Sequence, residues 1–330
     1  MHRFSALLLA MLLASPAPAQ EVSVALGSLH DIGGVESTYS WQLQYLHPIG
    51  ESFGASLSWW NEGHLVDHHR DGMTLQAWAF HRMKTNSLRL GVGIGTHRFF
   101  DTTSDTDGTY YRNDHGLKSL LSLQARYPAP SGAWAGFFQL NRTIGDSPQT
   151  RAVLIGVSAS FGGKRLRRAV APERSRSEAS ILEGPNEISF LFGRTILNSF
   201  SSETTDFLES FALDYRRQLG KHLDATVSYC DEGGIDTAKR DGIALQLWVT
   251  ARSPRHPWMI SFGLGPYLAR VYPSAASNAS TITVRSSPRY SILVGRHLGG
   301  HWDARLQWNR TLTNYHRDTD VLLTGLAYRW

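Results

Sequence analysis

Hydrophobic and polar residues alternate along most of this chain of 330 residues. A period of two predicts β-strands whose two faces meet different surroundings. Turn residues divide the alternating stretches into sixteen segments, each long enough to cross a membrane when tilted. The expected strands are 21–29, 38–47, 53–62, 72–83, 88–99, 116–127, 133–144, 151–161, 187–195, 207–218, 222–232, 241–252, 258–271, 286–297, 301–312 and 319–330.

The second eight segments repeat the first eight. Matching positions follow one another in the same order, and the spacing between the two members of each pair is nearly constant. Such agreement in order and spacing indicates an internal duplication. The matches include Asn61-Glu-Gly63 with Asp231-Glu-Gly233, Arg70-Asp-Gly72 with Arg240-Asp-Gly242, Gln76 with Gln246, and Asn141-Arg-Thr143 with Asn309-Arg-Thr311.

Each copy ends on an aromatic residue. In the second copy the run from Gly325 contains Tyr328 and stops at Trp330, and in the first copy Gly156 and Phe161 hold the matching positions. This ending resembles the closing strand of bacterial outer-membrane β-barrels of the small eight-stranded type. The resemblance implies that these five residues form insertion signals, and that the barrel-insertion machinery is a partner.

The segment 1–19 predicts a cleaved secretory signal peptide. Basic Arg3 is followed by an apolar run and by the small-residue site Ala17-Pro-Ala19. No later stretch has the roughly 18 consecutive apolar residues that a transmembrane helix needs. Together with the closing strands, this predicts a bacterial outer-membrane protein in contact with outer-membrane lipids and lipopolysaccharide.

Positive charge gathers between the two copies. The formal net charge is +5, and residues 162–186 hold a cluster of Lys and Arg without alternation. We therefore expect no nucleic-acid partner, and we interpret this segment as a basic periplasmic linker. The expected organisation is signal peptide 1–19, β-barrel repeat 20–161, linker 162–186 and β-barrel repeat 187–330.

The predicted fold class is all-β, a transmembrane antiparallel β-barrel with sixteen strands as two homologous eight-stranded units. Either each unit closes as its own barrel, or both merge into one sixteen-stranded barrel. An eight-stranded barrel is filled by side chains, whereas a sixteen-stranded one encloses an aqueous channel. The closing signal at Phe161 and the linker favour tandem barrels.

Polar residues recur in both copies near the strand ends expected to face outward from the cell. Two interpretations stay open: ion pairs that fix the loops, with Gly72 and Gly242 supplying the turns, or a small polar site for an unknown surface ligand. The candidates are Glu62, Arg70, Asp71, Gln76, Asn141, Glu232, Arg240, Asp241, Gln246 and Asn309.

Arg142 and Arg310 have outward parity at matching positions. An Arg guanidinium grips phosphate through two bonds, so these residues are candidates for binding lipopolysaccharide phosphates. The alternative is that both side chains snorkel into water.

Beyond these candidate binding residues, the sequence indicates no specific chemical activity. We assign no catalytic residue, metal or cofactor. The function it favours is a non-enzymatic outer-membrane protein that is structural or binds a surface ligand or lipopolysaccharide. A porin or export channel for small solutes or polysaccharide is the alternative, and a lipid-modifying enzyme acting through the rim carboxylates is the third possibility.

Overall fold

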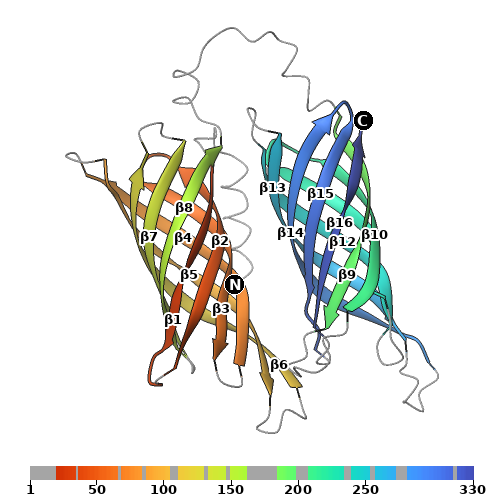
Figure 1. Cartoon of the computed structure of the whole chain (residues 1–330), viewed down its shortest axis with the longest axis horizontal. Coiled ribbons are helices and arrows are strands. Elements are labelled where there is room, and N and C mark those ends of the chain that lie inside the picture. The colour runs from red at the N-terminus through yellow and green to blue at the C-terminus, as the bar shows by residue number, and fades with distance from the viewer. Residues whose placement is uncertain are drawn as a thin grey trace. The chain divides into compact units, whose positions relative to one another are not determined.

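The computed structural model describes two separate β-barrels, each shown in Figure 1. The described residues are 20–34, 36–65, 68–83, 87–104, 111–129, 133–145, 149–161, 184–197, 207–233, 239–252, 257–272, 281–314 and 318–330. The expected signal peptide and nearly all of the expected linker lie outside them.

The first barrel contains eight strands. They are β1 (Gln20–Asp31), β2 (Ser37–Ile49), β3 (Phe53–Leu65), β4 (His68–Arg82), β5 (Arg89–Ser104), β6 (Tyr111–Pro128), β7 (Trp134–Ile144) and β8 (Thr150–Phe161).

The second barrel repeats this order. Its strands are β9 (Asn186–Leu197), β10 (Phe207–Gln218), β11 (Leu223–Asp231), β12 (Arg240–Arg252), β13 (Trp258–Val271), β14 (Thr283–Gly299), β15 (Trp302–Thr311) and β16 (Thr319–Arg329).

Each barrel closes on itself by pairing its first strand with its last. In the first barrel β1 pairs antiparallel with β8, and in the second β9 pairs with β16. Closure leaves no strand edge with unpaired backbone groups, which is the condition for crossing a lipid bilayer with strands. The predicted tandem architecture is therefore confirmed, and the alternative of one sixteen-stranded barrel is wrong.

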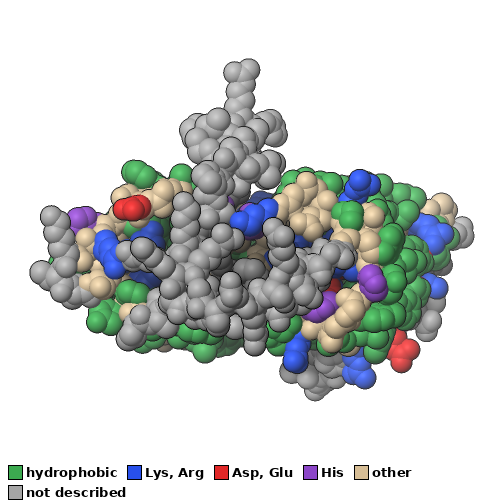
Figure 2. Space-filling view, turned by 90° about the horizontal axis from the view of Figure 1, so that it is seen from above, with side chains coloured by type: hydrophobic (Ala, Val, Ile, Leu, Met, Phe, Trp, Pro, Cys, Tyr) green, Lys and Arg blue, Asp and Glu red, His purple; other side chains and the backbone are tan. Residues whose placement is uncertain are grey.

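The alternation predicted from the sequence separates an apolar outer face from a polar interior. On β12, Ile243, Leu245 and Leu247 are exposed, whereas the intervening Gln246 and Trp248 are buried. Hydrophobic side chains cover the flanks of both barrels, as Figure 2 shows. An apolar outer band around a closed barrel is the surface of a transmembrane barrel.

Among the described residues, no helix is long and apolar enough to span a membrane.

Two ends can be distinguished in each barrel. At the "terminal end" the first strand begins and the last strand finishes, and at the opposite "loop end" β1 joins β2 and β9 joins β10. Aromatic side chains gather at the terminal end of the second barrel. The Trp330 ring centroid lies 6.4 Å from that of Tyr215 and 6.2 Å from that of Tyr328, and Trp302 meets Tyr328 at 5.2 Å. Such aromatic groups typically mark a membrane–water interface.

The strands extend further toward the loop end than the sequence predicted. Gly72 and Gly242, which we expected in turns, lie inside β4 and β12. A Cβ on either would stand 2.1 Å from a carbonyl oxygen of the next strand, so both glycines permit close strand contact. A positive φ occurs instead at Gly63, at a register shift within β3, and at Gly233, two residues after β11, with values of 76° and 73°.

Candidate functional site

The first barrel holds a buried carboxylate near its loop end. Glu62 of β3 is 1% exposed and faces Arg70 of β4. The Arg70 Nε donates to Glu62 Oε2, and its Nη2 donates to Oε1 at 3.3 Å. The Thr150 hydroxyl of β8 also donates to Oε1, and His97 Nδ1 lies 3.6 Å from Oε2. The expected ion pair between neighbouring strands is present, and it also reaches across the barrel.

The second barrel repeats this arrangement with one more cation. Glu232, the residue directly after β11, accepts a hydrogen bond from Arg240 Nε at 2.7 Å and another from Arg289 Nη2 of β14. The hydroxyls of Thr319 and Thr311 donate to the same carboxylate at 3.1 and 3.3 Å. The charge of Glu232 is thus enclosed by two guanidinium groups and two hydroxyls.

A chain of neutral hydrogen bonds lies beneath each carboxylate. In the first barrel Gln76 Nε2 donates to Ser122 at 2.8 Å, and Ser122 donates to Asn141 Oδ1 at 2.7 Å. In the second barrel Gln246, Ser291 and Asn309 form the same chain at 2.9 and 2.6 Å. The duplication has preserved a complete interior motif.

Several of these contacts cross the lumen. Gln139 of β7 donates to Gln42 of β2 at 3.0 Å, and three strand-to-strand steps separate those strands around the wall. The same separation applies to Thr150 and Glu62, and to Arg289 and Glu232. Because an eight-stranded barrel is narrow, side chains that bridge its walls fill it.

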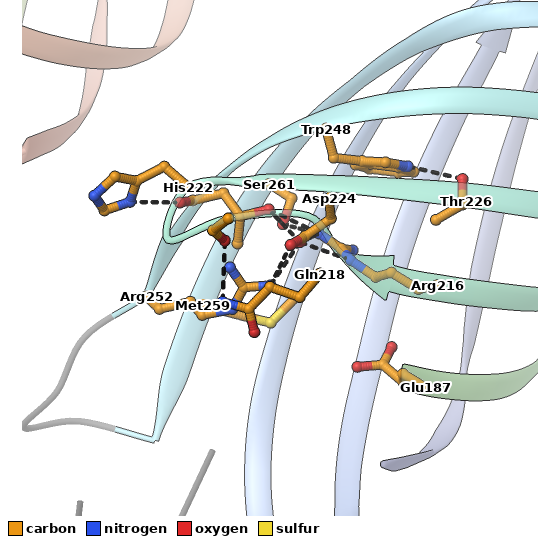
Figure 3. A network of polar contacts seen from close by, with 12 residues as sticks. Glu187, Arg216, Gln218, His222, Asp224, Thr226, Trp248, Arg252, Met259 and Ser261 are labelled. Carbon is orange, nitrogen blue, oxygen red and sulfur yellow. Dashed lines mark hydrogen bonds and ion pairs between the residues drawn. The ribbon is translucent and has the colours of Figure 1, made fainter. Parts of the chain in front are cut away.

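The terminal ends of the two interiors differ. In the second barrel Asp224 lies between two guanidinium groups, with Arg216 Nε at 2.9 Å and Arg252 Nη2 at 2.7 Å (Figure 3). The Thr250 hydroxyl donates to the same carboxylate at 2.7 Å. The first barrel has an ion pair of Arg126 with Glu21 at this end, beside an apolar cluster of Leu46, Trp78 and Phe80. Both solutions avoid an unpaired buried charge, which would be costly.

Asp71 and Asp241 are also buried, at 5% and 2% exposure, but they do not join the carboxylates of the interior. Alternation places them on the outer face, where Asp241 is directly opposite Arg270. Arg270 Nε donates to Asp241 Oδ1 at 3.2 Å, and the Tyr229 hydroxyl donates to Oδ2 at 2.9 Å. The rim candidates therefore divide into an interior group and an exterior group.

The two outward Arg candidates also differ. Arg142 is exposed at the end of β7, as expected. Arg310 is only 1% exposed and forms an ion pair with Asp320 at 2.6 Å, so its guanidinium already has an anionic partner, and its binding of lipopolysaccharide phosphate stays a prediction. Parity identified the face of the wall, but it did not identify the partner on the next strand.

Sequence reasoning missed Thr150, Thr319 and Arg289, which complete the carboxylate environments. Thr319 follows Thr150 at nearly the repeat spacing, so the duplication contained a signal for the two threonines. Arg289 has no such signal, because Leu120 occupies its place in the first copy: Gly95 pairs with Leu120 where Gly265 pairs with Arg289.

In the interior clusters, donors of the same barrel already occupy the oxygens of Glu62 and Glu232, so neither carboxylate is placed to act as a reactive acid or base. Each carboxylate accepts charge-assisted hydrogen bonds and is almost completely buried. Among the residues that the structure describes, no group of three or more His, Cys, Asp or Glu side chains could hold a metal ion.

Comparison with solved structures returns bacterial membrane barrels. The N-terminal β-barrel domain of Pseudomonas aeruginosa OprF aligns with 44% of this chain and 99% of its own length, at 13% identity and a TM-score of 0.35. The attachment invasion locus protein Ail of Yersinia pestis aligns with 43% of this chain and 97% of its own, at 11% identity and a TM-score of 0.34. No protein-family model matches the sequence, and no curated protein matches it. The fold itself is that of a small eight-stranded outer-membrane-type barrel, present twice in one chain.

Proposed function

We propose that this chain is a non-enzymatic protein of the bacterial outer membrane whose two barrels are closed to solutes. In this proposal the barrels serve as membrane-embedded supports that present their loop ends at the cell surface. The observation that carries the proposal is the filled interior of each barrel, where hydrogen bonds join strands on different sides of the wall.

The main support is the cost of opening such an interior. A solute path through the second barrel would have to separate Glu232 from Arg240 and Arg289, all of which are buried. Exposing one partner of a buried ion pair without the other is strongly unfavourable. The aqueous channel of a porin needs a wider barrel, so the separate closure of each eight-stranded unit supports barrels that are closed to solutes.

An enzymatic role has weaker support. General acid–base catalysis needs a titratable group within reach of a bound substrate. The buried carboxylates of Glu62 and Glu232 are instead occupied by Arg and Thr donors of the same barrel.

Planar-bilayer conductance tests the closed barrels directly. The mature chain, residues 20–330, would be refolded and inserted into a lipid bilayer under an applied potential. We expect no large, steady openings, because bridging side chains fill the narrow interior of each barrel. Regular openings from this mature chain would contradict the proposal and favour the channel alternative.

Cysteine labelling tests the proposed orientation. The chain has a single cysteine, Cys230, which is fully buried and gives little background labelling. A cysteine introduced by Asn314→Cys lies at the loop end of the second barrel, and one introduced by Gly220→Cys lies at the terminal end. A membrane-impermeant maleimide applied to whole cells should label the first variant, and should label the second only after lysis. The reverse pattern would invert the orientation.

A further inference from the structure

Three basic side chains stand in a row on the outer face of the first barrel. Register places His30 of β1 directly opposite Arg151 of β8, and Arg151 directly opposite Arg142 of β7. All three positions alternate to the outside, and both arginines are exposed. We name this row the "basic row".

The arginines of the basic row form no ion pair within the described part of the chain. No ion pair or side-chain hydrogen bond joins Arg142 or Arg151 to a described residue. Like charges directly opposite on adjacent strands destabilise a sheet. An anion that bridges the two guanidinium groups would remove this repulsion.

A cavity of about 340 Å³ adjoins the row at the loop end. It is lined by Arg142 and Arg151 together with Asp31, Ile32, Gly33 and Gly34. Asp31 belongs to the interior face by alternation, whereas the two arginines approach the cavity from the outer face. The cavity thus offers two guanidinium forks and space for a headgroup.

Directly below the row the wall is apolar. On the next outward positions of β8, Val153 is half-buried and Ile155 is 70% exposed. On β7 the outward Phe138 is exposed as well. A charged row that borders an apolar band fits a ligand with a phosphate headgroup and hydrocarbon chains, and not a free anion in water.

The second barrel supplies an internal comparison. The residue matching Arg151 is Asp320, and the residue opposite it on β9 is Ile196 in place of His30. Arg310, which matches Arg142, therefore pairs with Asp320 at 2.6 Å. Two of the three positions differ between the copies, and the change from Arg151 to Asp320 is the one that gives Arg310 an anionic partner.

We propose that the basic row of the first barrel binds the phosphate headgroup of an outer-leaflet lipid, and that the second barrel has no such site. Arg142 and Arg151 each present a guanidinium to the phosphate oxygens, and the alkyl chains lie against the apolar wall below. This goes beyond the proposed closed-barrel function and does not depend on it, because the site lies outside both lumens.

Native mass spectrometry of the full mature chain in detergent micelles tests the proposal with three probes. They are diphosphorylated lipid A, the same lipid A with its phosphates removed, and inorganic phosphate. We expect one diphosphorylated lipid A per chain, bound about tenfold or more tightly than the dephosphorylated lipid, because charge-assisted hydrogen bonds supply the difference. Inorganic phosphate at equal concentration should not displace it.

Arg151→Asp gives the first barrel the residue that the second barrel has at the matching position, Asp320. It is expected to weaken lipid A binding about tenfold or more, because the introduced carboxylate pairs with Arg142 and repels phosphate. The matched control is Arg217→Asp, a reversal at an exposed outward arginine that register places opposite Ala225 and Asn186 and not opposite another cation. The control should leave binding within about twofold of the parent, since a single isolated charge does not make the site.

Three results would overturn the proposal. They are unchanged binding by Arg151→Asp, equal binding of dephosphorylated lipid A, and displacement by inorganic phosphate, which would indicate a free anion as the ligand. The comparison of phosphorylated with dephosphorylated lipid uses the unaltered protein, so it decides the question even where a variant does not fold.

Discussion

Removing the charge of Glu232 should destabilise the second barrel more than almost any other single interior change. In Glu232→Gln the side chain keeps its shape but loses its charge. Arg240 and Arg289, which are 6% and 1% exposed, then lose the carboxylate that both share. Breaking a buried ion pair by removing one partner costs about 3–5 kcal/mol. With two cations dependent on one carboxylate, we expect a loss at the upper end, about 4–5 kcal/mol in the free energy of unfolding.

The first barrel supplies a matched control. Leu120 occupies the place of Arg289 there, and among the described arginines Glu62 pairs with Arg70 alone. Arg289→Leu should therefore leave Glu232 with Arg240 in a neutral pair and change stability by only about 1 kcal/mol, since the carboxylate keeps a cationic partner. Part of that change is the lost stacking of Arg289 over the Tyr267 ring, whose centroid is 3.6 Å away.

Hydrogen exchange of the full chain in lipid vesicles, measured at increasing urea concentration, assigns the effect to one barrel. Peptides from β11 and β12 report the second barrel, and peptides from β3 and β4 report the first as an internal reference. Glu232→Gln should lower the opening free energy of the β11 and β12 peptides only. A loss below about 1 kcal/mol for Glu232→Gln, or an equal loss for Arg289→Leu, would refute the claim that one carboxylate compensates two buried arginines.

Three further changes test the packing, the interface and the duplicated rim. Gly263→Ala places a Cβ 2.6 Å from the Trp248 ring and should cost about 1–3 kcal/mol in a denaturant titration, whereas Gly220→Ala, which meets no atom within 4 Å, should be close to neutral. Trp330→Ala removes an interfacial ring and should cost about 1–2 kcal/mol and slow insertion into vesicles; unchanged insertion would argue against its role in closing the barrel. Asp320→Arg should add a second bound lipid A in native mass spectra, and a chain that still binds one would show that the residue at this position is not sufficient to create the site.

Local pattern was enough to predict the strands and their faces. Successive side chains on a strand point to opposite faces, so parity alone placed Gln246 inside and Leu245 outside. It likewise placed Glu62 and Glu232 in the interior, and the short separation along the chain brought each carboxylate to its Arg on the next strand. The duplication could also be recognised directly, because it is a property of spacing.

Contacts between strands that are not neighbours in sequence could not be predicted. Thr150 reaches Glu62 and Arg289 reaches Glu232 only because each barrel closes after eight strands, and closure with its stagger decides which residues face one another across the lumen.

The outer face shows the same division between sequence and tertiary structure. The sequence by itself determined that Arg142 and Arg310 point outward, because outward direction follows from the period of two along one strand. Only the tertiary structure decided that Arg142 stands beside Arg151 while Arg310 pairs with Asp320, because the register between strands sets each cross-strand neighbour.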